Sequence, residues 1–134
     1  MNVEASGEVF IVVSALRALG HANAYGVPVA PWFCGEPIVV SYGEFDRESL
    51  QVGGAVRGVR SLVAHVCMDL PQDAEVTARA VAADLAGYDW AAATASPFRA
   101  VACDVGQPIY TGRDSSGRWI WDVPISLTVV VEHG

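Results

Sequence analysis

The chain has 134 residues, of which 52% are hydrophobic and 17% charged, and its formal net charge is −7. This length predicts a single domain over 1–134 with a substantial core, and the composition excludes intrinsic disorder, which needs low hydrophobicity and high charge. A lone nucleic-acid-binding module is disfavoured as well, because a phosphate-binding surface needs clustered cations.

The N-terminal segment is predicted to hold one helix followed by one loop. Apolar residues recur at helical spacing over 4–19, and Gly20 follows as a C-terminal stop. These apolar residues are Val9, Val12, Leu16 and Leu19. The Gly and Pro residues between 21 and 37 indicate a loop, which carries the apolar patch Trp32-Phe33-Cys34.

Two strands are predicted next, over 38–45 and 59–70. Alternate residues from Leu62 to Leu70 fall on one face of the second strand, while His65 and Cys67 fall on the other.

The segment between these strands, 46–58, is rich in glycine and charge. Its composition indicates a long mobile connection or a hairpin with a wide tip. We expect a flexible arm that orders on assembly, because such long loops are commonly functional. Its expected contact residues are Arg47, Leu50 and Val52.

A second helix is predicted over 73–85. Asp73 is expected to cap it and Glu75 to lie in its first turn, and Gly87 ends it. Its apolar positions repeat at spacings of four and three residues. The stretch 91–96 has no clear pattern and ends at Pro97.

The C-terminal part is predicted to be a β-hairpin. The strand over 98–113 is expected to be interrupted near Gly106 and Pro108, and Asp114 to Gly117 form a turn. The return strand over 118–132 alternates cleanly, and Pro124 suggests an edge position or a bulge. The fold class is therefore α+β, a mostly antiparallel sheet with two helices packed on one face and a C-terminal β-hairpin.

Candidate chemistry is sparse. His65 and Cys67 share a strand face, but no spacing indicates a further metal ligand, so we expect no metal, no cofactor and no catalytic residues. Structural packing is the expected role of both. His21 and His133 are expected at the surface, and the carboxylates on predicted strands give no paired acid–base site. These carboxylates are Asp69, Asp104 and Asp122.

The cysteines indicate a reducing compartment. Cys34, Cys67 and Cys103 are odd in number and form no CxxC motif, so reduced, partly buried thiols are expected. The first residues lack the cationic region of a signal peptide, since Glu4 and Glu8 precede the apolar run.

Several features of the sequence can also be interpreted as signs of protein–protein contacts. All eight basic residues are Arg; this reflects either a GC-rich genome or a surface partly used for interfaces, where Arg is favoured. Trp119 and Trp121 alternate with core positions, yet Trp119 also follows a projecting turn where an aromatic can anchor a neighbour. The candidate interface residues are Trp32, Phe33, Arg47, Leu50, Val52, Arg118 and Trp119.

Over nearly its whole length the chain resembles the tail terminator proteins of long-tailed bacteriophages. The resemblance lies in layout: an N-terminal helix, a Pro-rich connection into "EPIVVSYGEF", a strand "SLVAHVCMDL" that runs into "PQDAEVTARAVAADLAGYDW", and a final "GRWIWDVPISLTVVVEH". The terminal "VVVEH" strand also fits other phage neck and connector proteins.

The resemblance implies a structural protein and not an enzyme. It implies a homo-hexameric ring at the tail–neck junction of the virion, assembled in the host cytoplasm. The ring's partners would be further copies of itself, the tail tube protein and a head-side connector or neck protein. DNA would pass through its acidic lumen without specific binding, and no membrane would be involved.

Two other classes remain open. One is a small oligomeric α+β enzyme or ligand-binding domain with a pocket between sheet and helices near His65. The other is a transient adaptor that binds a partner strand at an exposed sheet edge.

Overall fold

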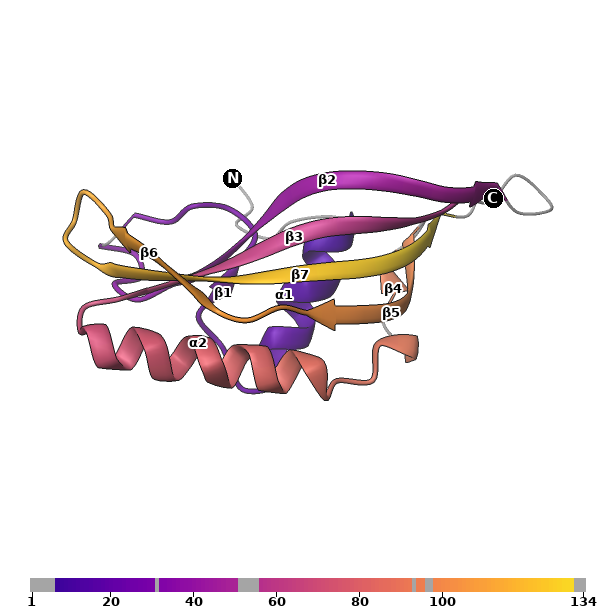
Figure 1. Cartoon of the computed structure of the whole chain (residues 1–134). Helices are drawn as coiled ribbons and strands as arrows, with labels where there is room; N and C mark the ends of the chain where they lie inside the picture. Colours follow the sequence, from indigo (N-terminus) through magenta and orange to yellow (C-terminus); the bar gives the residue numbers. More distant parts are fainter. Residues whose placement is uncertain (1–6, 31, 51–55, 93, 96–97, 132–134) are drawn as a thin grey trace.

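Two helices pack on one face of a curled sheet in the computed structural model (Figure 1), which describes residues 7–30, 32–50, 56–92, 94–95 and 98–131. The elements, in chain order, are α1 (Gly7–Ala18), β1 (Ala24–Tyr25), β2 (Ile38–Leu50), β3 (Val56–Met68), α2 (Pro71–Ala86), the 3-10 turn η1 (Trp90–Ala92), β4 (Thr94–Ala95), β5 (Phe98–Val105), β6 (Ile109–Arg113) and β7 (Trp119–Val131). The predicted α+β class is confirmed.

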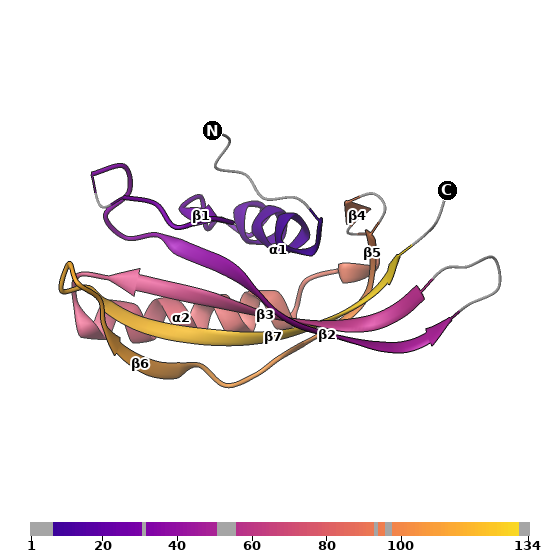
Figure 2. The same cartoon turned by 90° about the horizontal axis from the view of Figure 1, so that it is seen from above.

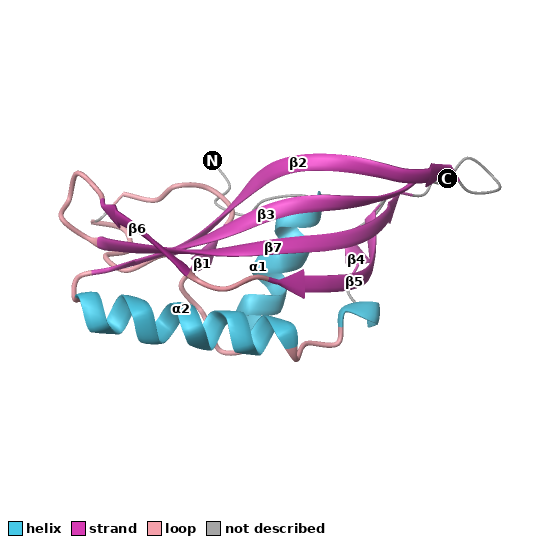
Figure 3. Ribbon diagram, in the orientation of Figure 1, coloured by secondary structure: helices cyan, strands magenta, loops and turns pink. Residues whose placement is uncertain are grey.

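The three 13-residue strands β2, β3 and β7 are neighbours in the sheet, as Figure 3 shows. The strand order is β1-β2-β3-β7-β5-β4, and β6 pairs with β7 on the edge that β5 also uses. The β1–β2 pair is parallel, and the remaining pairs in the described residues are antiparallel. Since β3 pairs with β7 from Val56↔Val131 to Met68↔Trp119 without a shift, these two strands fix the register of the whole sheet.

The core lies between the sheet and both helices. Strand alternation turns one face of β2, β3 and β7 toward the helices, and its residues are almost fully buried. These residues are Ile38, Val40, Leu62, Ala64, Val66, Val123, Ile125, Leu127 and Val129. The opposite face carries His65 and Asp122, as the alternation predicted.

Helix α1 confirms the predicted N-terminal helix within the described residues. Its Val9, Val12 and Leu16 are buried in the core, and Figure 2 shows the helix along one side of the sheet. The following loop contains the two-residue strand β1, which is too short to produce a periodic pattern. Within the described ranges, no helix is long and apolar enough to cross a bilayer.

Helix α2 starts two residues earlier than predicted. Leu70 is the N-cap residue and makes no capping hydrogen bond with its side chain. Pro71 is the first helical residue, and Asp73 lies in the first turn. The expected Asp73 cap is therefore wrong, because proline at the first position starts a helix with its φ already set and its missing N–H unneeded. Gly87 ends the helix as predicted and donates its N–H to the Ala83 carbonyl.

The β2–β3 hairpin replaces the long connection that the sequence indicated. Backbone pairing continues through Arg47↔Gly58 to Leu50↔Val56, with register shifts after Tyr42 and Arg47. The long mobile connection is thus wrong for 46–50 and 56–58, and the hairpin alternative is confirmed there. Val52 and the rest of 51–55 lie outside the described residues.

The C-terminal hairpin matches its prediction except at Pro124. The break at 106–108 separates β5 from β6, and Asp114 accepts backbone hydrogen bonds in the turn that follows β6. Pro124, however, lies in the central strand β7, opposite Val63 without a bulge. Its carbonyl accepts from the Gly106 N–H at 2.8 Å. The Pro124 nitrogen, which has no hydrogen to donate, therefore faces the gap between β5 and β6, so no hydrogen bond of the sheet is lost there.

Candidate functional site

An exposed aromatic loop projects from the connection between β1 and β2. Trp32 is 87% exposed and Phe33 51% exposed, which is unusual for side chains of this size. We call this segment, 32–37, the Trp32 loop. The Phe33 and Cys34 N–H groups both donate to the Ala30 carbonyl, and Phe33 packs edge-on against Tyr25 at 5.8 Å between ring centroids.

The root of the Trp32 loop is fixed to neighbouring elements. Asn23 donates its amide to the Glu36 carbonyl at 2.6 Å, and the Arg118 guanidinium donates to the Gly35 carbonyl at 3.3 Å. The aromatic tip is therefore presented from a pre-formed base, which lowers the entropy cost of docking it.

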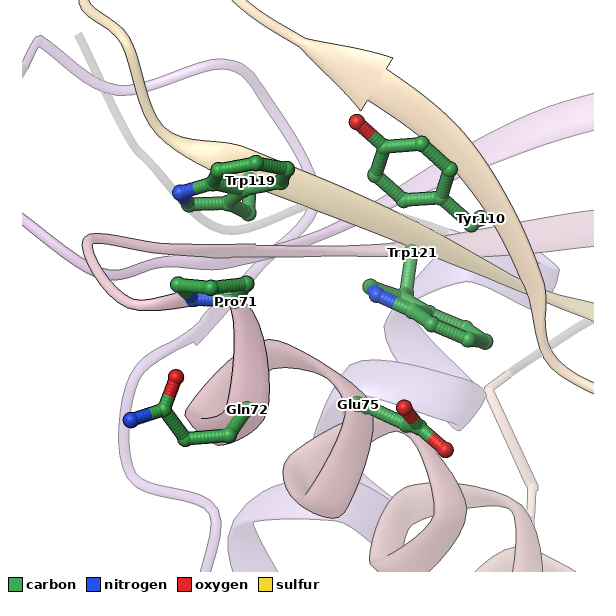
Figure 4. Close-up of a pocket in the computed structure, with 6 residues that line it drawn as sticks. All are labelled: Pro71, Gln72, Glu75, Tyr110, Trp119 and Trp121. Carbon is green, nitrogen blue, oxygen red and sulfur yellow. The ribbon is translucent and has the colours of Figure 1, made fainter.

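An aromatic groove of about 420 Å³ lies where α2 starts beneath the C-terminal hairpin (Figure 4). We define the aromatic groove by its lining residues, Pro71, Gln72, Glu75, Tyr110, Trp119 and Trp121. The Tyr110 ring lies 6.0 Å from that of Trp119 and 5.8 Å from that of Trp121. A concave apolar wall with a few polar groups is typical of a binding site.

The turn beside the groove is charged and held by hydrogen bonds. Arg113 stacks over the Trp119 ring at 4.7 Å, and the Arg118 guanidinium donates to the Asp114 carboxylate at 2.7 Å. Burial alone would raise the pKa of Asp114, but the hydrogen bonds from Arg118 and the Ser116 N–H, together with the Arg118 charge, hold it below its usual value. These contacts keep Trp119 in place.

The predicted interface residues fall into three groups. Trp32, Phe33 and Trp119 belong to the Trp32 loop or the aromatic groove. Arg118 is largely buried and braces the hairpin to the Trp32 loop. Arg47 and Leu50 lie toward the C-terminal end of β2, an end that Figure 1 shows far along the sheet from the β6–β7 hairpin, and Val52 is outside the described residues. The structure therefore does not bring the six described residues into one patch.

A second site lies on the outer face of the sheet, away from the helices. The Ser41 Oγ is 2.9 Å from the His65 Nε2, and the His65 Nδ1 is 2.6 Å from the Asp122 Oδ1. These three side chains come from β2, β3 and β7, where Val39 and Asp122 are the register partners of His65. We call them the outer-face triad. His65 points to the side of the sheet away from the helices, so it does not face the space in which the enzyme or ligand-binding alternative placed a pocket.

The remaining titratable groups have structural roles. His21 lies 2.8 Å from the Asp84 carboxylate, and its side chain is 16% exposed, so it is more buried than the surface position expected for it. Burial raises the pKa of the Cys67 thiol, and burial with the nearby Asp104 charge raises that of Cys103 to about 12. His133 is not among the described residues. Those described contain no group of three His, Cys, Asp or Glu side chains placed to hold a metal.

Strand alternation predicted the face of its own strand on which His65 lies, but not its pairing with Asp122, the contact with Ser41 or the groove. These needed the β2–β3 and β3–β7 registers, which the sequence does not show. Comparison with models of known protein families finds no match, and comparison with curated proteins finds none either.

Proposed function

We propose that this protein is a structural assembly subunit of the phage tail terminator type, which forms a closed homo-oligomeric ring, most simply a hexamer. In that role the ring caps the tail tube, stops its polymerisation and joins it to a head-side connector. The proposal rests on the layout resemblance and on one structural observation: each subunit carries an aromatic protrusion and an aromatic groove.

The Trp32 loop and the aromatic groove lie on opposite sides of the same end of the molecule. In Figure 2 the β1–β2 connection lies on the α1 side, and β6, which contributes Tyr110 to the groove, lies on the other side. A protrusion and a groove on different sides can join subunits only head to tail, and a head-to-tail contact that closes produces a ring. Arg118 contacts both Asp114 and Gly35 and so braces the two sides against each other.

The side chains match what such a contact needs. Tryptophan and tyrosine carry a large share of interface energy when they are fully desolvated. Seating Trp32 against Tyr110, Trp119 and Pro71 would remove its 87% exposed indole from water. The net charge of −7 per chain would give the lumen a negative potential and limit adhesion of passing DNA.

Light scattering and electron microscopy of the purified protein over its whole soluble concentration range test this proposal. We expect a closed ring whose dissociation shifts to higher concentration in Trp32→Ala. Val76→Ala is the matched control, because Val76 is also an exposed apolar residue, at 68%, but does not line the groove.

Photo-cross-linking identifies the contact itself. A photoreactive phenylalanine analogue at position 32 should cross-link to peptides containing Tyr110 or Trp119 of a second copy, and the same analogue at position 76 should not. A protein that stays monomeric at every concentration and gives no such cross-link would exclude this ring contact.

A further inference from the structure

The outer-face triad has the hydrogen-bond arrangement that activates a serine. We propose that Ser41 is a nucleophile that accepts an acyl group from small carboxylic esters, with His65 as its general base and Asp122 as the residue that positions the imidazole. This activity is separate from ring assembly, because the triad lies outside both the Trp32 loop and the aromatic groove.

With a neutral imidazole, the donors and acceptors of the triad admit one arrangement. An ionised Asp122 carboxylate can only accept, so the His65 Nδ1 carries the proton at that 2.6 Å contact. The Nε2 of a neutral imidazole is then a bare acceptor, and the Ser41 hydroxyl donates to it over 2.9 Å. The nucleophile, the base and the orienting carboxylate are therefore hydrogen-bonded in the same order as in the catalytic triads of serine hydrolases, which occur on unrelated folds.

The sheet holds this geometry rigidly. His65 lies on the central strand β3 and is paired with Val39 on one side and Asp122 on the other. Sites on strands are more precise than sites on loops, because the ladder fixes the backbone. A register shift follows directly at Tyr42, and such bulges are frequent beside active sites because they redirect side chains.

The face is accessible, and Ser41 is its best nucleophile. The His65 side chain is 34% exposed and that of Asp122 is 24% exposed, so a small ester can reach them. Cys67 lies two residues from His65, but burial raises the pKa of its thiol and its sulfur contacts the His65 carbonyl. In the described structure neither Ser61 nor Ser126 on this face contacts an imidazole.

The acyl transfer balances with water as the second reactant. The Ser41 Oγ forms a bond to the ester carbonyl carbon as the Ser41 proton moves to the His65 Nε2. The bond between that carbon and the leaving alcohol then breaks, and the His65 Nε2 delivers the proton to the alcohol. Water then loses a proton to the Nε2 and attacks the acyl group, which releases a carboxylic acid and restores the Ser41 hydroxyl.

Labelling of the intact protein with a fluorophosphonate and with p-nitrophenyl acetate tests the proposal, with the modified residue located by mass spectrometry. We expect one adduct per chain, on Ser41, and none in Ser41→Ala. Ser61→Ala is the matched control, since Ser61 lies on the same face of the neighbouring strand and should leave the rate unchanged. Labelling of Ser41 no faster than that of Ser61 would overturn the proposal.

Two variants separate the base from the positioning residue. His65→Ala should lower the labelling rate at least about 100-fold, which is the usual loss when a general base is removed. Asp122→Asn should also lower it, because the asparagine amide can donate to the Nδ1, which moves the imidazole proton to the Nε2 and removes the acceptor for Ser41. Circular dichroism checks that both variants fold.

The pH profile distinguishes a base from a structural contact. Labelling of the wild type should be slower at acid pH, since a protonated ring cannot accept the Ser41 proton. Asp122 is the titratable group hydrogen-bonded to the ring. Cys67 lies two residues further along β3, where its sulfur contacts the His65 backbone carbonyl, and the charges of Arg118, Asp114 and Asp122 act on its thiol. A rate that does not fall at acid pH, or an unchanged rate in His65→Ala, would refute the role of His65.

Discussion

Glu8 and Arg60 form an ion pair that fastens α1 to the centre of the sheet. The Arg60 Nε lies 2.8 Å from the Glu8 Oε2, with Glu8 only 2% exposed and Arg60 24% exposed. The Arg60 guanidinium also stacks on the Tyr42 ring at 5.1 Å. A carboxylate inside the core is tolerated only with such a partner, because an unpaired buried charge is very costly.

Arg60→Met is expected to destabilise the protein by about 3 kcal/mol, because it leaves the buried Glu8 carboxylate without its partner. The double variant Glu8→Leu/Arg60→Met should recover much of this loss, since it removes both charges. Urea unfolding measures both values.

Arg79→Met is the control for this prediction. Arg79 and Glu75 form an exposed pair one helical turn apart, at 3.1 Å, and its loss should cost no more than about 0.5 kcal/mol. Equal losses for Arg60→Met and Arg79→Met would contradict the buried character of the first pair.

Gly106→Ala is expected to destabilise the protein by about 1–3 kcal/mol through overpacking. A Cβ at this position would come within 2.7 Å of the Pro124 Cγ, which belongs to a ring that cannot swing away. Gly87→Ala is the matched control, since its Cβ would meet ordinary contacts at 3.6 Å and its φ of −94° suits alanine. Thermal unfolding of both variants gives the difference; a neutral Gly106→Ala would show that the 106–108 segment can move off β7.

The long strands of this fold were predictable and their pairing was not. The alternation in β3 and β7 is strong enough to give the buried face and the outer face from sequence alone. The continuation of β2 through Arg47 was missed because charge and glycine suggested a loop, whereas pairing with β3 supplies the backbone partners that local composition does not reveal.

The functional sites depend on this pairing. The outer-face triad needs the β2–β3–β7 register, in which a shift of one residue would turn Ser41 to the other face. The aromatic groove needs the start of α2 at Pro71 to lie beneath Trp119 and Trp121. The sequence left two interpretations of Trp119 open, a core residue or an interface residue. Its position on the wall of a groove is compatible with either one.

The Cys103 thiol should resist alkylation in the folded protein. Its pKa is raised to about 12, chiefly by burial and secondly by the Asp104 charge, so little thiolate exists at pH 9. Iodoacetamide should therefore modify Cys103 at least about tenfold more slowly than in the urea-unfolded chain. Cys34, which is also half-buried, is the internal reference. Equal protection of both cysteines would mean that limited access of the reagent, and not the raised thiol pKa, slows the reaction. Asp104→Asn removes the nearby negative charge and should speed the reaction at Cys103.

Acid stability should depend on Asp114. The pKa of this carboxyl is held below its usual value of 3.8 by hydrogen bonds from Arg118 and Ser116 that outweigh its burial. A carboxyl with a depressed folded-state pKa contributes stability that is fully present above its unfolded pKa and is lost as the pH falls through the folded one. Asp114→Asn keeps an oxygen acceptor for the Ser116 and Arg118 N–H groups but loses the charge, so we expect a loss of about 1 kcal/mol at pH 7.

The size of this loss should itself depend on pH. Below about pH 4 the unfolded wild-type chain takes up a proton at this carboxyl, and the folded protein does so only at lower pH, so the difference between the two proteins should shrink as the pH falls. Urea unfolding at pH 7, 5, 4 and 3 measures it, with Asp69→Asn as the control, because Asp69 is an exposed residue whose side chain makes no hydrogen bond in the described structure. A difference that stays constant from pH 7 to pH 3 would mean that the asparagine perturbs the turn by its shape, and that the Arg118–Asp114 charge pair does not stabilise the hairpin beside Trp119.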